Sequence, residues 1–467
     1  MNAYALAGIL GYVIVQFAIG AWVSRRMTSE QDYILAGRSL GPGLVAFSVF
    51  ATWFGAEAIV ASAGEIYSRG LAGGLTDPFG YGVAVLIVGL LLAAPLWRRG
   101  IVTYADMVRS RYSAATEKLF VVVLLPGSVL WAAAQVRAFG QILGSTTGLD
   151  VGTAVVIAAV LVGAYSVVGG LLADAVTDVV QGIAVMVGLV VLALFVAAAV
   201  GGPMAAISGI EPARLSLAQG ADEGPFDRYE KLAVVLCGSL VAVELVSRFL
   251  GARSAKVAAT GTVAGGLMYL AFGLFPLFLG LVGPALIKGL GEPEQIVPKL
   301  AEAYLPPVGY ALFVGALVSA ILSVVHAALH APAAQLSHNV VLRILPGLSP
   351  RGRLYSVRLS VLTLSLVAWV LAQRVTTIKE LVELASAFGS AGAIVVAMFG
   401  LFTGFGGPIA AMFALASGSL VWALGKFVLE LQTPYLAALG TALAGYVVMG
   451  LIEHRRRPPS GTHVRSR

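Results

Sequence analysis

Long apolar segments recur along the whole chain, separated by short stretches that carry most of the charged residues. About 20 consecutive apolar residues are enough to cross the hydrocarbon core of a bilayer as a helix. The pattern therefore predicts an all-α polytopic membrane protein with about 13 transmembrane helices. We expect these spans at residues 3–23, 41–67, 77–96, 118–146, 151–168, 174–200, 232–250, 257–285, 307–332, 356–373, 382–402, 407–429 and 433–452.

The composition agrees with a membrane protein. Of the 467 residues, 59% are hydrophobic and 11% are charged, and the mean hydropathy is +0.92; soluble domains carry about 25% charged residues. The first span has no basic region before it and no clear small-residue cleavage site, so we interpret it as a retained helix rather than a signal peptide.

The single cysteine, Cys237, excludes an internal disulfide. No phosphate-binding glycine loop, Ser-His-Asp arrangement or cysteine cluster indicates an enzyme.

The net charge of +7 has a simple explanation in the topology. If the N-terminus lies outside, 20 of the 30 Lys and Arg residues fall on the cytoplasmic side of the predicted spans and nine fall outside. Cytoplasmic loops of membrane proteins carry such an excess of basic residues. We therefore expect a multi-pass protein of the inner membrane with its C-terminus in the cytoplasm, and no nucleic-acid partner. The sequence does not indicate an oligomeric state.

Two of the predicted spans look like interrupted helices. The stretch "FATWFGAEAIVASAG" (50–64) combines a Trp-Phe-Gly step with a glutamate, and the stretch 234–254 contains Gly238-Ser239 near its middle. They begin the first and sixth spans after the leading helix. In transporters built from two inverted repeats, paired breaks of this kind form the binding site near the membrane midplane. Unwound backbone is tolerated there because it lines a cavity inside the protein.

Several segments, in order along the chain, resemble the sodium:solute symporter family. They are "EQDYILAGRSLGPGLVAFSVFATWFGAEAIVASAGEIYSRGL" (30–71), "TYADMVRSRYS" (103–113), "YSVVGGLLADAVTDVVQG" (165–182), "ELVSRFLGARSAKVA" (244–258) and "GALVSAILSVVHAALHAPAAQLSHNVV" (315–341). The resemblance implies the LeuT-type fold, with a 5+5 inverted repeat, one leading helix and two trailing helices.

The resemblance also implies a division of the chain. The predicted parts are a leading helix and cytoplasmic loop (1–40), a first repeat (41–200), an extracellular loop (201–231), a second repeat (232–402), two trailing helices (403–452) and a cytoplasmic tail (453–467).

A sodium ion in this family lies between the first and eighth core helices. Carried over residue by residue, the resemblance assigns backbone carbonyl ligands to Ala51, Phe54 and Ala320 and a hydroxyl ligand to Ser323. The next hydroxyl position of the family is Val324, which has no oxygen on its side chain. Since sodium is a hard cation that takes several oxygen ligands, this loss should weaken the site.

Three residues are candidates for contacting a solute. An intramembrane carboxylate such as Glu57 normally faces a cavity or a partner, and it suits an ammonium group or hydroxyls; a structural ion pair or a protonated carboxyl is the alternative. Arg137 would suit a carboxylate, or it pairs with Glu57 or reaches the outer interface. Trp53 would form one wall of the pocket, although a tryptophan within the membrane is more often used in packing. Gln135 is expected on a different helix face from Arg137.

Polar residues at helical spacing form two further pairs. His326 and His330 lie four residues apart and so share one helix face; together with Asp174 or Asp178, His326 could handle protons in place of sodium, or both histidines could simply line a hydrated inner vestibule. By the resemblance, Asp178 matches an aspartate near the sodium exit path. Glu244 and Arg248 have the same spacing and predict a structural pair or an inner gate.

The sequence as a whole predicts a secondary active transporter. It would import a small polar organic solute (an amino acid, another zwitterion or a carboxylate) by alternating access, with sodium as the coupling ion. A proton-coupled or uncoupled carrier of the same fold remains an alternative, as does a transporter-like sensor that signals to a partner protein. A channel is less favoured, because the paired breaks are typical of carriers.

Overall fold

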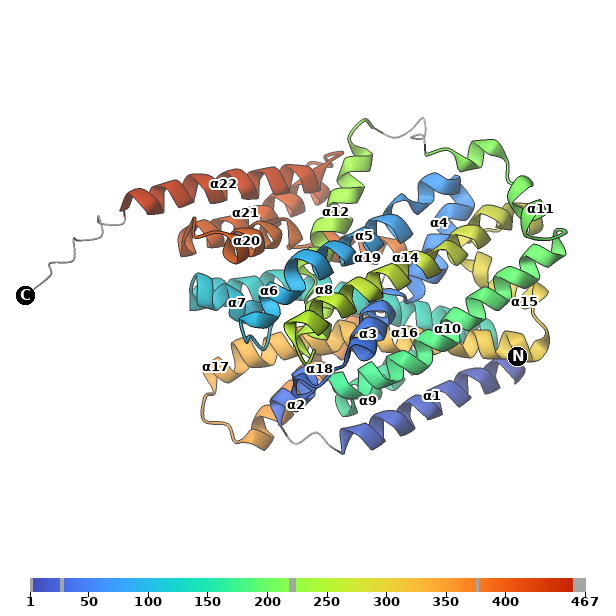
Figure 1. Cartoon of the computed structure of the whole chain (residues 1–467), viewed down its shortest axis with the longest axis horizontal. Coiled ribbons are helices and arrows are strands. Elements are labelled where there is room, and N and C mark those ends of the chain that lie inside the picture. Colours follow the sequence, from blue (N-terminus) through green and yellow to red (C-terminus); the bar gives the residue numbers. More distant parts are fainter. Residues whose placement is uncertain (1–2, 26–28, 218–223, 375–377, 457–467) are drawn as a thin grey trace, which may run out of the picture.

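The computed structural model describes residues 3–25, 29–217, 224–374 and 378–456. Its elements are helices throughout, and no strand occurs within these ranges. Eleven helical stretches are long and apolar enough to cross a membrane, and two shorter apolar helices, Pro42–Trp53 and Val151–Val167, accompany them. Traced along the described chain, these stretches form thirteen spans, as the hydrophobic pattern predicts (Figure 1).

The range predicted as the first repeat contains five spans. The first of them is interrupted, and the second changes helical pitch along its length. Their elements are α3 (Pro42–Trp53) with η2 (Glu57–Ala61) and α4 (Ser62–Arg69); η4 (Leu75–Gly80), α5 (Tyr81–Ile87), η5 (Val88–Leu92) and α6 (Ala93–Arg98); α8 (Ala114–Thr147); α9 (Val151–Val168); and α10 (Leu171–Ala199).

The range predicted as the second repeat also contains five spans, again with an interrupted first member. Its elements are α12 (Asp227–Val241) with α13 (Val243–Leu250); α14 (Ala255–Leu286); α16 (Pro307–Gln335); α18 (Pro350–Ala372); and α19 (Ile378–Ala387) with α20 (Ser390–Phe402). The relation of the two ranges as inverted repeats stays a prediction.

Short helices lie between the spans. They are α2 (Glu30–Leu35), η1 (Ala36–Arg38), η3 (Gly70–Gly74), α7 (Tyr104–Arg111), α11 (Pro203–Ser208), η6 (Pro212–Leu215), η7 (Pro293–Gln295), α15 (Ile296–Tyr304), η8 (Leu336–Val341) and α17 (Leu342–Ile344). Part of the predicted loop 201–231 and most of the predicted tail 453–467 lie outside the described residues.

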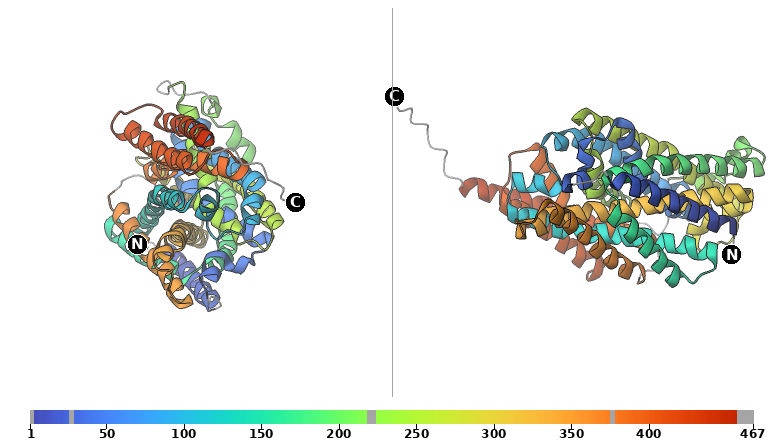
Figure 2. Two further views of the ribbon diagram at one scale, coloured as in Figure 1. Left: turned by 90° about the vertical axis from the view of Figure 1, so that its left-hand side faces the viewer. Right: turned by 90° about the horizontal axis from the view of Figure 1, so that it is seen from below.

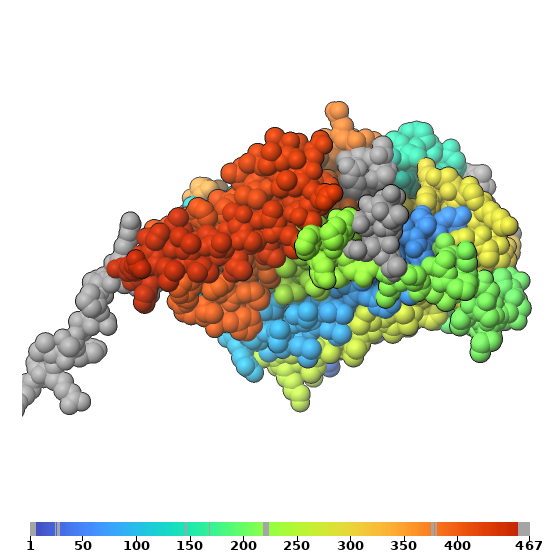
Figure 3. All heavy atoms as spheres, turned by 90° about the horizontal axis from the view of Figure 1, so that it is seen from above, coloured from blue at the N-terminus to red at the C-terminus, as the bar shows by residue number. Residues whose placement is uncertain are grey.

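The leading and trailing helices lie on opposite sides of this core. The leading helix α1 (Ala3–Ser24) packs along α16 and α10, whereas α21 (Pro408–Phe427) and α22 (Pro434–Arg456) pack against each other and against α20 (Figures 1 and 2). In the space-filling view the trailing pair borders α12 (Figure 3).

Carboxylates hold the trailing pair in place by capping the first turn of each helix. Glu230 on α12 accepts hydrogen bonds from the amides of Tyr435 and Leu436, at 2.6 and 2.9 Å. Glu453 on α22 accepts from the amides of Gly407, Ile409 and Ala410 at 2.8–3.1 Å. The first amides of a helix have no partner within the helix, and negative charge is favourable at that end.

Both predicted interruptions occur. The first lies between α3 and η2, where Phe54 leaves helical geometry (φ −93°, ψ 61°), and the second is at Ala242 (φ −62°, ψ 114°) between α12 and α13. The position predicted for the second break, at Gly238-Ser239, is wrong, because both residues belong to α12. Gly238 serves close packing instead: a Cβ atom there would lie 2.6 Å from the carbonyl oxygen of Ser386 on α19.

Candidate functional site

A pocket lies where the two interrupted helices face each other. Trp53 and Glu57, on either side of the first break, line it together with Ala242 and Glu244 at the second break. Side chains from α5, α8, α19 and α20 complete its walls. The two breaks, which are almost 190 residues apart in the sequence, therefore contribute to one site, as paired interruptions in transporters do.

Aromatic rings surround Glu57 in this pocket. The indole nitrogen of Trp131 on α8 donates a hydrogen bond to Oε2 of Glu57 at 3.1 Å, and the rings of Trp131 and Trp53 lie 5.4 Å apart. Tyr81 also lines the pocket, and its hydroxyl lies 3.2 Å from that of Ser386. These contacts orient the Glu57 carboxylate and leave aromatic faces beside it.

The pocket contains a second carboxylate, which the sequence analysis assigned elsewhere. Glu244 is 4% exposed, and its Oε1 atom has no hydrogen-bond partner within the described structure. The predicted pair between Glu244 and Arg248 does not form, because Arg248 binds Asp174 on α10. No Lys, Arg or His is among the described residues that line the pocket. Its charged side chains, Glu57 and Glu244, are thus both acidic.

Arg137 lies away from this pocket. Its Nη1 atom is 3.4 Å from the carbonyl oxygen of Ala372, at the end of α18, and no ion pair with Glu57 is found among the described residues. The structure thus brings Glu57 and Trp53 together, as predicted, but separates Arg137 from them. Three participants were missed: Glu244, Trp131 and Tyr81. For Glu244, its place just after an interrupted helix, like that of Glu57, was the available signal.

The residues assigned to sodium also come together, at the contact of α3 with α16. Ala51, Phe54, Ala320 and Ser323 are all buried. Within the described structure no hydrogen bond reaches the carbonyl oxygens of Ala51 and Phe54, since the helix ends at this point. These free carbonyls and the Ser323 hydroxyl are hard oxygen donors of the kind that sodium takes. The residues therefore fit a sodium ion, with the Val324 position contributing no oxygen.

Asp178 lies directly beside the assigned sodium ligands. Its Oδ1 atom accepts a hydrogen bond from the Ser323 hydroxyl, and its Oδ2 atom accepts one from Ser48 on α3 at 2.7 Å. Asp178 is fully buried on α10. One carboxylate thus connects α10 to both α3 and α16. Its place on an ion path stays a prediction.

A buried cluster of charged residues lies near Asp178, around Asp174, which is four residues earlier on α10. The Asp174 carboxylate contacts Arg248 of α13 and lies 3.0 Å from Nδ1 of His326. All three side chains are at most 1% exposed. The His326 and His330 rings stack at 5.2 Å, and Nε2 of His330 is 3.0 Å from the Tyr33 carbonyl oxygen. His330 therefore has a structural partner, whereas His326 joins the ionic cluster.

Comparison with known proteins establishes the family. The sequence model of the sodium:solute symporter family matches residues 33–416. The chain belongs to this family. It is 25% identical over 461 residues to the high-affinity proline transporter PutP of Bacillus subtilis, covering 90% of this chain and 93% of that protein. The sodium/pantothenate symporter of Escherichia coli is 25% identical over 358 residues, 74% of each chain.

A more similar but shorter match is with choline transporters. The high-affinity choline transporter 1 of Drosophila melanogaster is 30% identical over 193 residues. This match covers 40% of the present chain and 31% of the fly protein, so the chain spans about a third of the length of that relative.

Solved structures of transporters share the LeuT-type fold with this member of the family. The structure of a substrate-bound, outward-open sodium-coupled sialic acid symporter superposes with a TM-score of 0.85, 15% identity and 98% coverage of both chains. The nucleobase-cation symporter Mhp1 gives a TM-score of 0.60 at 15% identity, with 91% of this chain covered and 95% of the other. These likenesses support the helical fold described above.

The Asp174–Arg248 pair leads to a prediction about stability. Replacing Arg248 with Gln leaves the buried Asp174 carboxylate without its cation, which costs about 3–5 kcal/mol for a buried pair. We expect Arg248→Gln to lower the thermal unfolding temperature of the detergent-purified protein, and Asp174→Asn/Arg248→Gln to recover part of the loss. Arg351→Gln, in the exposed first turn of α18, is the control. Equal unfolding temperatures for Arg248→Gln and the native protein would contradict the pairing.

Proposed function

We propose that the protein is a secondary active transporter that imports a small organic solute by alternating access, in symport with sodium. Membership of the sodium:solute symporter family supports the coupling ion. The pocket between two interrupted helices supports alternating access, because such breaks let one site open to either side of the membrane. The two five-span ranges, 41–200 and 232–402, would then move against each other as the inverted repeats.

We further propose that the solute carries a positively charged nitrogen. The single observation behind this is the pair of acidic side chains, Glu57 and Glu244, in a pocket without a described basic residue. Coulomb attraction to a cation is strong where water is excluded. The faces of Trp53 and Trp131 add cation–π attraction. An ammonium or a zwitterion suits such a pocket, whereas a free carboxylate would be repelled.

The names of the relatives agree with this choice in part. Choline and proline, named for the fly and Bacillus subtilis proteins, both carry a positively charged nitrogen. Pantothenate, named for the Escherichia coli protein, is an anion, which two carboxylates in this pocket would disfavour. Choline and proline are therefore the first probes.

Ala51, Phe54, Ala320 and Ser323 would hold the sodium ion. A bound cation there supplies positive charge beside the free carbonyls of the first break and links α3 to α16 electrostatically. Asp178 orients the Ser323 hydroxyl through its hydrogen bond and connects both to α10. The solute pocket and the ion site thus share one interrupted helix, so that occupation of either favours the same arrangement of the break.

Uptake into proteoliposomes tests the function. We expect an inward sodium gradient to drive accumulation of choline or proline but not of pantothenate. Glu57→Gln removes a negative charge from the pocket and should raise the KM of the transported probe at least about tenfold, equivalent to about 1.4 kcal/mol. The control is Glu302→Gln, since Glu302 is exposed and paired with Lys299 at 3.1 Å.

Three outcomes would contradict the proposal. Accumulation of pantothenate, or an unchanged KM in both Glu57→Gln and Glu244→Gln, would exclude a cation-selective pocket. Tight binding of a probe with no accumulation under any gradient would favour a sensor over a carrier.

One observation favours a second candidate, proton coupling. His326 contacts Asp174 within a fully buried cluster, and a histidine can exchange a proton near neutral pH. In a proton-coupled carrier, His326 and Asp178 would lie on the proton path. The absence of a side-chain oxygen at Val324 would then reflect the replacement of sodium by protons as the coupling ion.

Imposing the sodium and proton gradients separately distinguishes the two versions. For sodium coupling we expect uptake to follow the sodium gradient, and His326→Ala to keep the pH dependence of the native protein. Uptake driven by a proton gradient alone, and loss of its pH dependence in His326→Ala, would instead establish proton coupling. His330→Ala is the matched control, because His330 stacks on His326 but lies outside the ionic cluster.

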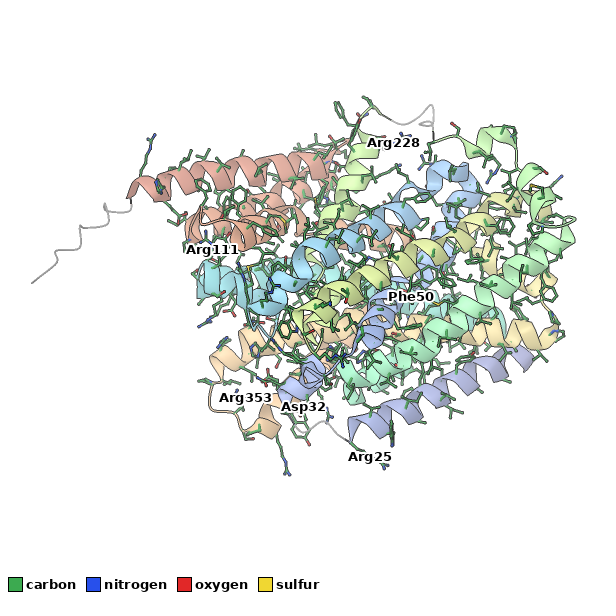
Figure 4. The ribbon with its side chains drawn as sticks, viewed as in Figure 1. Arg25, Asp32, Phe50, Arg111, Arg228 and Arg353 are labelled. Atoms are coloured by element: carbon green, nitrogen blue, oxygen red, sulfur yellow. The ribbon has the colours of Figure 1, made fainter. Side chains whose placement is uncertain are left out.

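We also propose an inner-membrane location with the N-terminus outside and the C-terminus in the cytoplasm. Arg25, Asp32, Arg111 and Arg353 lie toward the left and lower edges of the molecule in Figure 4, whereas Arg228 lies at its top. The excess of Lys and Arg in the loops on one side of the predicted spans supports this orientation.

Cysteine labelling in intact cells tests this orientation. In a Cys237→Ser background, we expect Gly291→Cys to react with an impermeant maleimide from outside. Gly347→Cys should react only after permeabilisation. Both glycines are exposed and have open space around them, so neither substitution should disturb packing. The reverse labelling pattern would invert the proposed topology.

A further inference from the structure

Gln135 is an unusual side chain within the core of the protein. It lies on α8, is 0% exposed, and neither its amide oxygen nor its amide nitrogen has a hydrogen-bond partner in the described structure. A buried amide without partners costs free energy, about 1–3 kcal/mol in protein mutants. Such a group suggests that a further partner completes the site.

The Gln135 side chain is directed at the first helix break. A Cβ atom built on Gly55 would lie 3.2 Å from Oε1 of Gln135 and 2.7 Å from Cγ2 of Val324. Gln135 and Val324 therefore approach the same point of the interrupted helix from α8 and α16. Because neither amide atom is engaged, the amide can turn its oxygen toward the break.

Gln135 lies near the residues assigned to sodium rather than in the pocket that contains Glu57. Ser128 and Trp131, on the same helix, line the pocket with Glu57, but Gln135 does not. Its neighbours are Gly55, next to the free carbonyl of Phe54, and Val324, next to Ser323. The amide thus lies beside the position at which this chain lacks a hydroxyl.

We propose that Gln135 supplies the oxygen that Val324 does not, and so completes the sodium site from α8. Sodium favours neutral amide and carbonyl oxygens as well as hydroxyls, and the amide of Gln135 has no competing partner. The cage would then draw on three helices, α3, α8 and α16. This inference rests on the proposed sodium coupling.

Sodium binding to the purified protein tests the inference without transport. The fluorescence of Trp53 and Trp131, close to the break, and the thermal unfolding temperature are followed as NaCl replaces KCl at constant ionic strength. Gln135→Met keeps the length of the side chain but removes its oxygen, and we expect the sodium half-saturation concentration to rise about tenfold. Adding Val324→Thr, which restores a hydroxyl with almost the shape of valine, should reverse most of that change.

Two further variants sharpen the test. Gln335→Met removes another buried amide on α16 with an unpartnered nitrogen, far along the helix from Ser323, and should leave sodium binding unchanged. Gln135→Glu keeps the side-chain oxygen, replaces the amide nitrogen with a second oxygen and adds negative charge, so it should tighten sodium binding at least threefold. This variant keeps the proposal testable if Gln135→Met does not fold.

The outcomes separate the inference from the proposed function. A native protein that responds equally to NaCl and KCl would overturn sodium coupling itself. A sodium response that is the same in the native protein, Gln135→Met and Gln135→Glu would overturn only the role of Gln135. If Gln135→Met instead changed the half-saturation by choline or proline at saturating sodium, and left sodium binding unchanged, the amide would belong to the solute pocket and the inference would again fail.

Discussion

Backbone amides and carbonyls inside a bilayer must find partners within the protein, because the hydrocarbon offers none. Two helices of this protein are interrupted, at Phe54 and at Ala242. At the first break, the carbonyl oxygens of Ala51 and Phe54 accept no hydrogen bond within the described structure. The freed groups are surrounded by other helices rather than by lipid. Two features of the site follow from these interruptions: residues at both breaks line the pocket, and carbonyl oxygens at the first break have no hydrogen-bond partner within the described structure.

Charge is divided between the two sides of the first break. On the pocket side, Glu57 and Glu244 have no basic residue beside them among the described residues that line the pocket. On the inner side, Asp174 is balanced by Arg248 and approached by His326. A buried carboxylate is stable only with such compensation. The contrast separates the acidic side chains that line the pocket from the one that holds helices together.

The number of spans and the first break could be predicted, because hydrophobic length and the Trp-Phe-Gly step before Glu57 are local properties of the sequence. The assignments that depended on how helices face one another were less accurate. Gly238 was interpreted as a break, yet it is small because α19 approaches it closely. Glu244 and Arg248 have the spacing of a pair, but α13 directs one to the pocket and the other to α10. Which neighbour a side chain meets is decided by tertiary packing.

The same limit explains Gln135. Its helix spacing from Arg137 indicated only that the two point in different directions, and nothing local in the sequence connected it with Gly55 or Val324. The structure shows that a small residue at 55 lets both approach the break. By the family resemblance, Val324 stands where a hydroxyl residue is expected on α16. The amide of Gln135, which has no hydrogen-bond partner in the described structure, approaches the same point of the break from α8. In a closely packed core, a substitution on one helix is compensated most directly by the side chain that contacts the same atoms.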